Sequence, residues 1–310
     1  MYDTIPTILS KSNYNCDHTC VAFNLKDTLA LQEAEVSFFN SKMNKKIDLK
    51  NEMTFIIPIR IDNEIRFRNL NKIISFLEIN YQNFKIIISE QDEKPKLNDK
   101  FNYEYLFEVS IKNFQKTKAI NKAILKTDTT FACIYDSDYV VSPLSFNHCF
   151  KKLQTDAKFA HPSMGLNLYL DRQTSEKFII SNVLPSYKTL SDQAFFDPAH
   201  YLGLCFMFNV KSYKDIGMEN QNFTTWGFED QERFVRISKL NLKTYFSPSC
   251  GYHLWHPRNG DFYEGVTFKT DQIIHSYSNQ NNLNELLKIN SMSKNELLME
   301  LQNWEWYCPN

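Results

Sequence analysis

The stretch TFIIPIRID, residues 54–62, decides the fold class of this chain. Its first six residues are almost wholly apolar, as in a strand buried on both faces, and a helical spacing of apolar residues follows them. A second apolar run, residues 84–88, comes next along the chain. Two such strands joined by a helix form a βαβ unit, so we predict an α/β fold with a mostly parallel central sheet flanked by helices.

The first half of the chain contains no glycine, and the first glycine in the sequence is Gly165. Rossmann folds, P-loop enzymes and nucleotidyltransferases with a glycine-rich first loop need glycines directly after the first strand, so the sequence disfavours all three. Ligands of parallel sheets bind beyond the carboxyl ends of the strands. Residues 58–62 and 90–92 are therefore candidate nucleotide contacts, and a diphosphate bound there needs a metal ion as its counter-charge.

Two aspartates, Asp136 and Asp138, directly follow a buried type of strand at residues 131–135. Carboxylates separated by one residue can serve one hard divalent cation, the nearer directly and the other through water. Upstream, residues 113–124 form a helical pattern with a basic start that contains Lys118 and Asn121. Taken alone, this helix fits a nucleotide site or a surface helix with solvated lysines.

The motif TTWGFEDQE, residues 224–232, places three acidic residues, two aromatic rings and one glycine in nine positions. A helical pattern begins at residue 231, so Glu229 and Asp230 are predicted at a helix N-terminus, where negative charge is favourable. Acidic residues are also common in first turns that have no catalytic role. The motif is thus a candidate catalytic acid pair or the ordinary start of a helix.

Two histidines, His253 and His256, lie three residues apart and are followed by Arg258. Imidazole can bind a metal ion, and a guanidinium can bind a phosphate. A lone histidine is more often structural. The two histidines together with the earlier aspartates favour at least one of them as a metal ligand.

The composition of this 310-residue chain excludes several classes of protein. Its net charge is −1, which is unlike a protein that binds nucleic acid by neutralising phosphates. No apolar run approaches the roughly 20 residues that span a bilayer. Seven scattered cysteines do not resemble a disulfide framework. We therefore expect a cytoplasmic chain without nucleic-acid partners, with peripheral contact to the inner face of a membrane as an option.

The remaining two regions differ in regularity. Between residues 141 and 200 the pattern loosens, with a possible strand at 163–170 and a loop-rich stretch at 175–198, as in a lid or a substrate-facing insertion. Residues 282–310 are predicted to form two helices separated near Ser293, which with Glu296 makes a capping box. The aromatic residues 304–307 fit packing on the domain, a sugar-binding cleft or a membrane interface, and packing is favoured.

The order of these motifs resembles the inverting glycosyltransferases of GT-A fold. The resemblance is greatest to the group that joins bacterial chondroitin-type capsule polymerases with the C-terminal galactosyltransferase motif of animal enzymes. It covers residues 53–259 and rests on five ordered pieces, which are IPIR at 57–60, residues 114–121, DSD at 136–138, WGFED at 226–230 and HLWHP at 253–257. Phe228 departs from the pattern, because many relatives carry a second glycine there.

The resemblance implies a set of contacts for the donor nucleotide sugar. Those around the uridine are Pro58, Ile59, Arg60, Asp62 and Glu90. Lys118 and Asn121 would lie near the nucleotide, Trp226 would stack on the sugar or the acceptor, and Arg258 would reach a phosphate.

The resemblance also implies a metal site and a catalytic pair. Asp138 would bind Mn²⁺ (or Mg²⁺) directly, Asp136 would support it and contact the ribose or a metal-bound water, and His253 or His256 would complete the site. Asp230 would be the catalytic base and Glu229 would orient the sugar or the acceptor.

We therefore predict a UDP-sugar-dependent hexosyltransferase, with Gal, GalNAc or a related hexose as the transferred sugar and a glycan or lipid-linked glycan as the acceptor, in capsule or lipopolysaccharide biosynthesis. The predicted divisions are an extension at 1–52, a GT-A domain at 53–260 with a nucleotide-binding half (53–140) and an acceptor half (141–260), and a helical tail at 261–310. The alternatives are a metal-dependent nucleotidyltransferase and an inactive sugar-binding module of the same fold.

Overall fold

The computed structural model describes residues 25–41, 45–97, 103–111, 114–190, 202–225, 227–257 and 280–307, and the backbone of β10 (Phe195–Asp197). Its centre is a seven-stranded sheet in the order β12-β8-β11-β6-β2-β4-β5. In that order the strands are Thr244–Phe246, Phe159–His161, Cys205–Asn209, Phe131–Tyr135, Met53–Ile59, Lys85–Asp92 and Glu104–Val109. Neighbouring strands run parallel except at β11, which is antiparallel to β6 and β8. The predicted α/β fold with a mostly parallel central sheet is confirmed.

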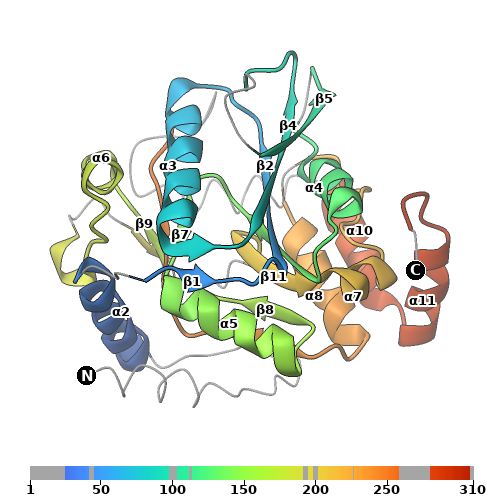
Figure 1. Ribbon diagram of the computed structural model, residues 1–310. Coiled ribbons are helices and arrows are strands. Elements are labelled where there is room, and N and C mark those ends of the chain that lie inside the picture. Colours follow the sequence, from blue (N-terminus) through green and yellow to red (C-terminus); the bar gives the residue numbers. More distant parts are fainter. Residues whose placement is uncertain are drawn as a thin grey trace.

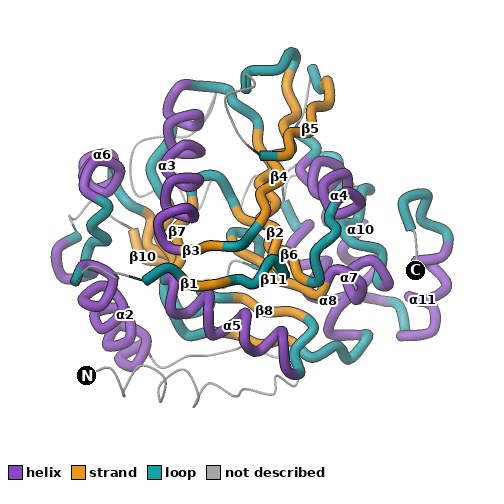
Figure 2. Tube along the Cα trace, viewed as in Figure 1, coloured by secondary structure: helices purple, strands orange, loops and turns teal. Residues whose placement is uncertain are grey.

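Helices cover both faces of this sheet, as Figures 1 and 2 show. Every residue of β2 is buried, and its successive side chains alternate between the faces, so Phe55 and Ile57 join one hydrophobic cluster and Ile56 the other. The first face packs on α3 (Glu64–Asn80) and α5 (Pro143–Thr155). The second face packs on α4 (Lys116–Lys126), α7 (Val210–Asp215), α8 (Glu229–Lys239), α10 (Gln280–Ser291) and α11 (Lys294–Gln302).

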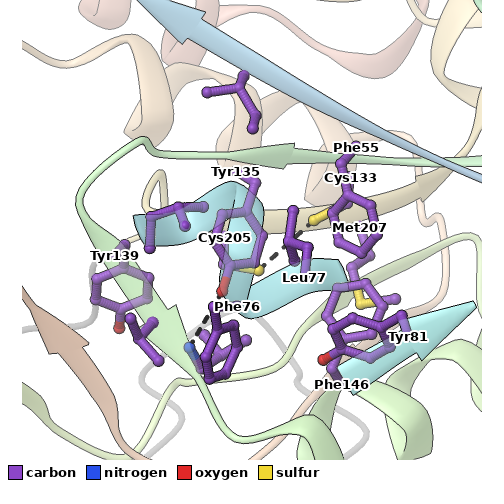
Figure 3. Packing of buried hydrophobic residues seen from close by; sticks show 14 of the residues in the cluster. Phe55, Phe76, Leu77, Tyr81, Cys133, Tyr135, Tyr139, Phe146, Cys205 and Met207 are labelled. Carbon is purple, nitrogen blue, oxygen red and sulfur yellow. Dashed lines mark hydrogen bonds between the residues drawn. The ribbon is translucent and has the colours of Figure 1, made fainter. Parts of the chain in front are cut away.

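Phe55 lies at the centre of the aromatic core on the first face (Figure 3). Its ring stacks on Phe146 of α5 at 5.2 Å and meets Tyr135 of β6 edge-on at 5.8 Å. A change of such a buried Phe to Ala costs about 3–5 kcal/mol. This packing fixes β2 and β6 side by side, and with them the polar residues that follow both strands.

A second sheet of four strands, in the order β10-β9-β13-β7, lies beside the first. Strand β7 (Tyr139–Val141) follows β6 after a short turn and pairs antiparallel with β13 (Gly251–His253), so that Tyr139 opposes His253. Strand β9 (Asn167–Tyr169) pairs parallel with the other edge of β13. The second sheet thereby brings the late histidines to the end of β6.

The described part of the N-terminal extension packs against the second sheet. In α2 (Leu25–Asn40), the Gln32 side chain donates to the Tyr252 hydroxyl at 2.7 Å, and Glu35 accepts a hydrogen bond from Ser249 at 2.5 Å. Strand β1 (Ile47–Asp48) pairs with β3 (Tyr81–Gln82), next to the first face. The domain limits at residues 52, 140 and 260 stay predictions.

Within residues 141–200, the possible strand at 163–170 is confirmed by β9, whereas the loop-rich assignment of residues 175–198 is wrong at its start, which belongs to a helix. Besides α5, β8 and β9, this region contains α6 (Arg172–Ser181) and a short 3₁₀ turn at Tyr187–Thr189. Helix α6 escaped the sequence analysis because it buries only Ser175 and Phe178, too few for a clear apolar period. Its capping signals were nevertheless present, since Asp171 accepts from the Thr174 amide and Asn182 ends the helix in a left-handed conformation.

The C-terminal tail contains the two predicted helices, α10 and α11, with the predicted capping box of Ser293 and Glu296. Trp304 is only 5% exposed, so packing is the correct interpretation for this aromatic residue. Within the described residues, no helix has both the length and the apolar character needed to cross a bilayer. The cysteines that the structure describes, Cys133, Cys149, Cys205 and Cys250, are free thiols.

Candidate active site

A three-residue cluster with metal-ligand chemistry lies where β6 passes into β7. Asp138 sits in the turn between these strands, and β13 presents His253 beside it. The Leu254 amide donates to the Asp138 carbonyl at 2.7 Å and fixes the chain that leads to His256. One ligand atom from each of Asp138, His253 and His256 lies within 4.8 Å of the others. All three residues are buried.

Both imidazoles present the same nitrogen to this cluster. The Nδ1 atom of His253 lies 2.9 Å from the Leu254 carbonyl oxygen, and that of His256 lies 3.1 Å from the Pro257 carbonyl oxygen. A carbonyl oxygen can only accept, so each Nδ1 carries the donated proton and Nε2 is left to face Asp138, at 3.7 Å and 3.1 Å. Metal-binding histidines are oriented in this way by the hydrogen bond of their second nitrogen.

The two aspartates of the turn lie in different electrostatic surroundings. Burial opposes charge on Asp138, but His253, His256 and Arg66 outweigh it and hold the pKa of this carboxyl well below its usual range. Burial raises the pKa of Asp136 to about 6, against the opposing effect of Lys116. Asp138 is thus the more strongly anionic of the two carboxyls.

The acidic pair begins α8, as predicted. Two residues with positive φ, Gly227 at 112° and Phe228 at 69°, turn the chain into the helix. The Glu229 carboxylate accepts from the Gly227 amide at 2.7 Å, and burial followed by the neighbouring charge of Asp230 raises the pKa of Glu229 to about 7.

Asp230 is the more accessible member of the pair, because 26% of its side chain is exposed. Its Oδ1 accepts from Arg233 at 2.8 Å. It lies so close over Gly203 that a Cβ atom there would come within 2.0 Å of a carboxylate oxygen. Gly203 therefore makes room for this side chain.

Lys116 interacts with Asp136 after β6 and with the acidic pair of α8. Its Nζ lies 2.8 Å from Asp136, and the side chain is about one-fifth exposed. Burial would lower the pKa of Lys116, but the carboxylates of Asp136, Asp230 and Glu229 raise it above its ordinary value. The charges of the turn after β6 and of the start of α8 therefore both act on Lys116.

Several residues that the resemblance placed around the nucleotide lie at the carboxyl end of β2. Pro58 and Ile59 are buried in the strand, and Arg60 is half-buried, with a long contact of 3.5 Å to the Ile111 carbonyl. Asp62 pairs with Arg66 at 3.2 Å. Arg66 also lies 3.2 Å from Asp138, so this end of β2 is joined to the histidine cluster.

Three other assigned residues have contacts of their own. Lys118 is exposed and pairs with Glu108 at 2.6 Å. Asn121 is 1% exposed, and its amide bonds the backbone nitrogen and oxygen of Glu219 at 2.9 Å and 2.8 Å. Glu90 is completely buried and accepts from the Tyr105 hydroxyl at 2.5 Å and from the Lys96 amide at 3.1 Å.

These contacts give Asn121 and Glu90 structural partners, so neither side chain is open to a nucleotide in this structure. Trp226 and Arg258 lie outside the described residues. Three residues that the sequence analysis missed are Lys116, Arg66 and Arg233. The basic start of the helix at residues 113–124 was the available signal for Lys116, and a spacing of one helical turn from Asp62 was the signal for Arg66.

One known sequence family matches part of the chain. A sequence model of the family described as the N-terminal domain of galactosyltransferase matches residues 194–257, a range that contains the acidic pair, His253 and His256. No curated protein matches the chain significantly.

Solved structures with a similar arrangement include three glycosyltransferases of low identity. The catalytic domain of Drosophila β1,4-galactosyltransferase 7, in complex with xylobiose, is 15% identical over 70% of this chain and 77% of its own, with a TM-score of 0.42. Glucosyl-3-phosphoglycerate synthase from Mycobacterium tuberculosis, with Mn²⁺, UDP and phosphoglyceric acid, is 10% identical over 89% and 85%, with a TM-score of 0.45.

GalNAc-T7, in complex with UDP, GalNAc and Mn²⁺, is 13% identical over 73% of this chain and 48% of its own, with a TM-score of 0.46. All three TM-scores lie below 0.5, so the likeness to these structures is distant.

Proposed function

We propose that this chain is a metal-dependent inverting glycosyltransferase of GT-A fold that transfers a sugar from a UDP-sugar to a glycan acceptor. The observation that carries this proposal is the convergence of Asp138, His253 and His256 within 4.8 Å, in a space that Lys116 shares electrostatically with Glu229 and Asp230. The family match over residues 194–257 supports it independently.

The residues present fit a divalent metal ion. Their ligand atoms are one carboxylate oxygen and two imidazole nitrogens, and the Nδ1 hydrogen bonds already orient both rings. Imidazole ligands favour Mn²⁺ over Mg²⁺, for which oxygen ligands are preferred. When bound here, the metal supplies Lewis-acid stabilisation of the charge that develops on the leaving diphosphate.

The chain's own residues supply the other requirements of the reaction. Asp230 is the partly exposed carboxylate, so it takes the proton of the acceptor hydroxyl as that hydroxyl attacks the sugar. Arg233 holds the Asp230 side chain in place. Glu229, with a pKa of about 7, is positioned to hydrogen-bond the sugar or the acceptor in either protonation state.

Lys116 adds positive charge to the space between the two acidic groups. A diphosphate that enters the site can take over the contact that Lys116 makes with Asp136, because phosphate oxygens and carboxylates compete for the same ammonium group. The inverting stereochemistry follows from the resemblance in the five ordered motifs.

The same resemblance favours Gal, GalNAc or a related hexose as the transferred sugar. It also favours a free or lipid-linked glycan acceptor in the synthesis of a capsule or lipopolysaccharide. A cytoplasmic location, with peripheral contact to the inner face of a membrane, belongs to this proposal.

A panel of UDP-sugars with Mn²⁺, with and without a chelator, tests the proposal. We expect metal-dependent release of UDP with one or a few donors and its loss in Asp138→Asn. Asp156→Asn is the matched control, because Asp156 pairs with Lys243 on the surface and is half exposed. Release of pyrophosphate would instead assign the site to a nucleotidyltransferase. Sugar binding without turnover under any metal condition would leave an inactive sugar-binding module.

A further inference from the structure

The described C-terminal residues 280–307 make many of their polar contacts with residues 215–225 and Gly227. This segment connects α7 to the acidic pair at the start of α8. Helices α10 and α11 lie beside α7 and α8 on the second face of the sheet (Figure 1). The contacts reach backbone groups of the segment more often than its side chains.

The contact nearest the site comes from Asn282 in the first turn of α10. Its side-chain nitrogen donates to the Gly227 carbonyl at 2.8 Å and to the Thr225 carbonyl at 3.1 Å. Asn282 is only 2% exposed. Its two carbonyl partners belong to the residues on either side of position 226. Gly227 begins the positive-φ turn, and its amide donates to the Glu229 carboxylate.

One turn further along α10, Glu285 holds the earlier part of the segment. A single carboxylate oxygen accepts from Asn220 at 2.8 Å and from Asn222 at 2.9 Å. Asn220 is 1% exposed, so its side-chain amide is shielded from water where it contacts Glu285. Glu285 therefore fixes the loop that precedes the acidic motif.

The end of the chain holds the beginning of the segment. The Trp306 ring nitrogen donates to the Gly217 carbonyl at 3.1 Å, and the Tyr307 hydroxyl donates to the Asp215 carbonyl at 3.1 Å. Beneath these contacts Leu297 and Leu301 of α11 are completely buried in the cluster on the second face. Apolar packing thus docks the helices, and the polar contacts set the path of the segment.

We infer that α10, α11 and the residues that follow them to Tyr307 act as a brace that sets the conformation of residues 215–225 and 227–228, and that Asn282 is a positioning residue for Glu229 and Asp230. Asn282 does this through the Gly227 and Thr225 carbonyls, which it holds on either side of residue 226. The inference rests on the proposed function for its turnover measurement only.

Hydrogen–deuterium exchange tests the brace without any assumption about activity. In Asn282→Ala we expect faster exchange of the amides of residues 227–232, with exchange in β2 and β6 unchanged. Asn281→Ala is the matched control, because Asn281 is the adjacent residue of the same helix and is exposed. Unchanged exchange at residues 227–232 in Asn282→Ala would overturn the inference, whatever reaction the protein catalyses.

Steady-state kinetics then test positioning. We expect kcat of Asn282→Ala to fall about 10- to 100-fold, as a displaced catalytic group does, with the KM for the donor and the affinity for Mn²⁺ nearly unchanged. Asn282→Asp keeps the shape but turns an acceptor toward two carbonyls, so its loss should be at least as large. An unaltered kcat in both variants would contradict positioning, while a wild-type protein without turnover would count against the proposed function and leave the exchange result standing.

A core variant separates positioning from a general loss of stability. Ile86→Val, in the buried part of β4, should lower Tm with little effect on kcat. If kcat follows Tm equally in this variant and in Asn282→Ala, the role of Asn282 is stability alone. Retained Mn²⁺ binding in each variant confirms that the Asp138 cluster is folded.

Discussion

Replacement of Asp230 by Asn tests the proposed proton transfer most directly, because it removes the charge and keeps the shape of the side chain. The Asn oxygen can still accept from Arg233, and the side chain still fits over Gly203. The variant should therefore fold with the cluster of Asp138, His253 and His256 intact.

The expected effects on turnover and stability differ in size. Loss of a general base lowers kcat by a factor on the order of 10² to 10⁴, or about 2.7–5.5 kcal/mol at 1.36 kcal/mol per tenfold. The ion pair with Arg233 at 2.8 Å involves a carboxylate that is 26% exposed, so its loss should cost about 1 kcal/mol of stability or less. Catalysis should thus suffer far more than folding.

UDP release with saturating Mn²⁺ and donor gives kcat, and titration with UDP gives the nucleotide affinity. Asp128→Asn serves as the control, because Asp128 pairs with Lys85 at 2.6 Å on the surface. A loss of UDP affinity in Asp230→Asn as large as its loss of turnover would give Asp230 a structural role instead. A kcat within a factor of two of the wild type would contradict proton transfer by Asp230.

Three further predictions follow from buried charges and from the histidine cluster. His256→Ala should weaken Mn²⁺ binding by about 10-fold or more in a calorimetric titration, whereas His148→Ala, in α5, should not. Arg233→Met should lower the free energy of unfolding, measured in urea, by about 3–5 kcal/mol, because it leaves the Glu219 charge buried without its partner at 2.6 Å. Addition of Glu219→Gln should recover part of that loss. No recovery in the double variant would contradict the ion-pair explanation. Glu35 is 4% exposed, and burial raises its pKa from 4.5 to about 7. The stability that it confers is therefore complete below pH 4.5 and is lost as the pH rises through 7. Glu35→Gln should flatten the pH profile of the free energy of unfolding by roughly 3 kcal/mol, and an unaltered profile would refute this role.

The strands and the acidic motifs were predictable because each has a strong local signal. The uninterrupted apolar run of β2 indicated a buried parallel strand. The apolar run of β6 likewise showed that Asp136 and Asp138 follow directly after a buried strand. The acidic start of α8 followed from the apolar period behind it. Such signals need no knowledge of which segments meet in space.

The choice between neighbouring residues on one helix was not predictable in the same way. Lys116 and Lys118 are two residues apart, which places them on different sides of α4, and only the docking of that helix decides that Lys116 faces Asp136. Asn121 lies one further turn along, where α4 meets the backbone of Glu219. The apolar residues of α4 narrow its orientation but do not fix it to one side chain.

Strand β11 is the one strand of the central sheet whose direction is reversed relative to its neighbours β6 and β8. Because Cys205, its first residue, lies opposite Tyr135, the last of β6, the chain approaches β11 at the same edge where the aspartates lie. Leu204 accepts from the Asp136 amide there, and Leu202 accepts from Arg233. Residues 202–204 thus link the backbone of the aspartate turn to the side chain that holds Asp230, so their conformation can change the relation between the two acidic groups while every strand keeps its register.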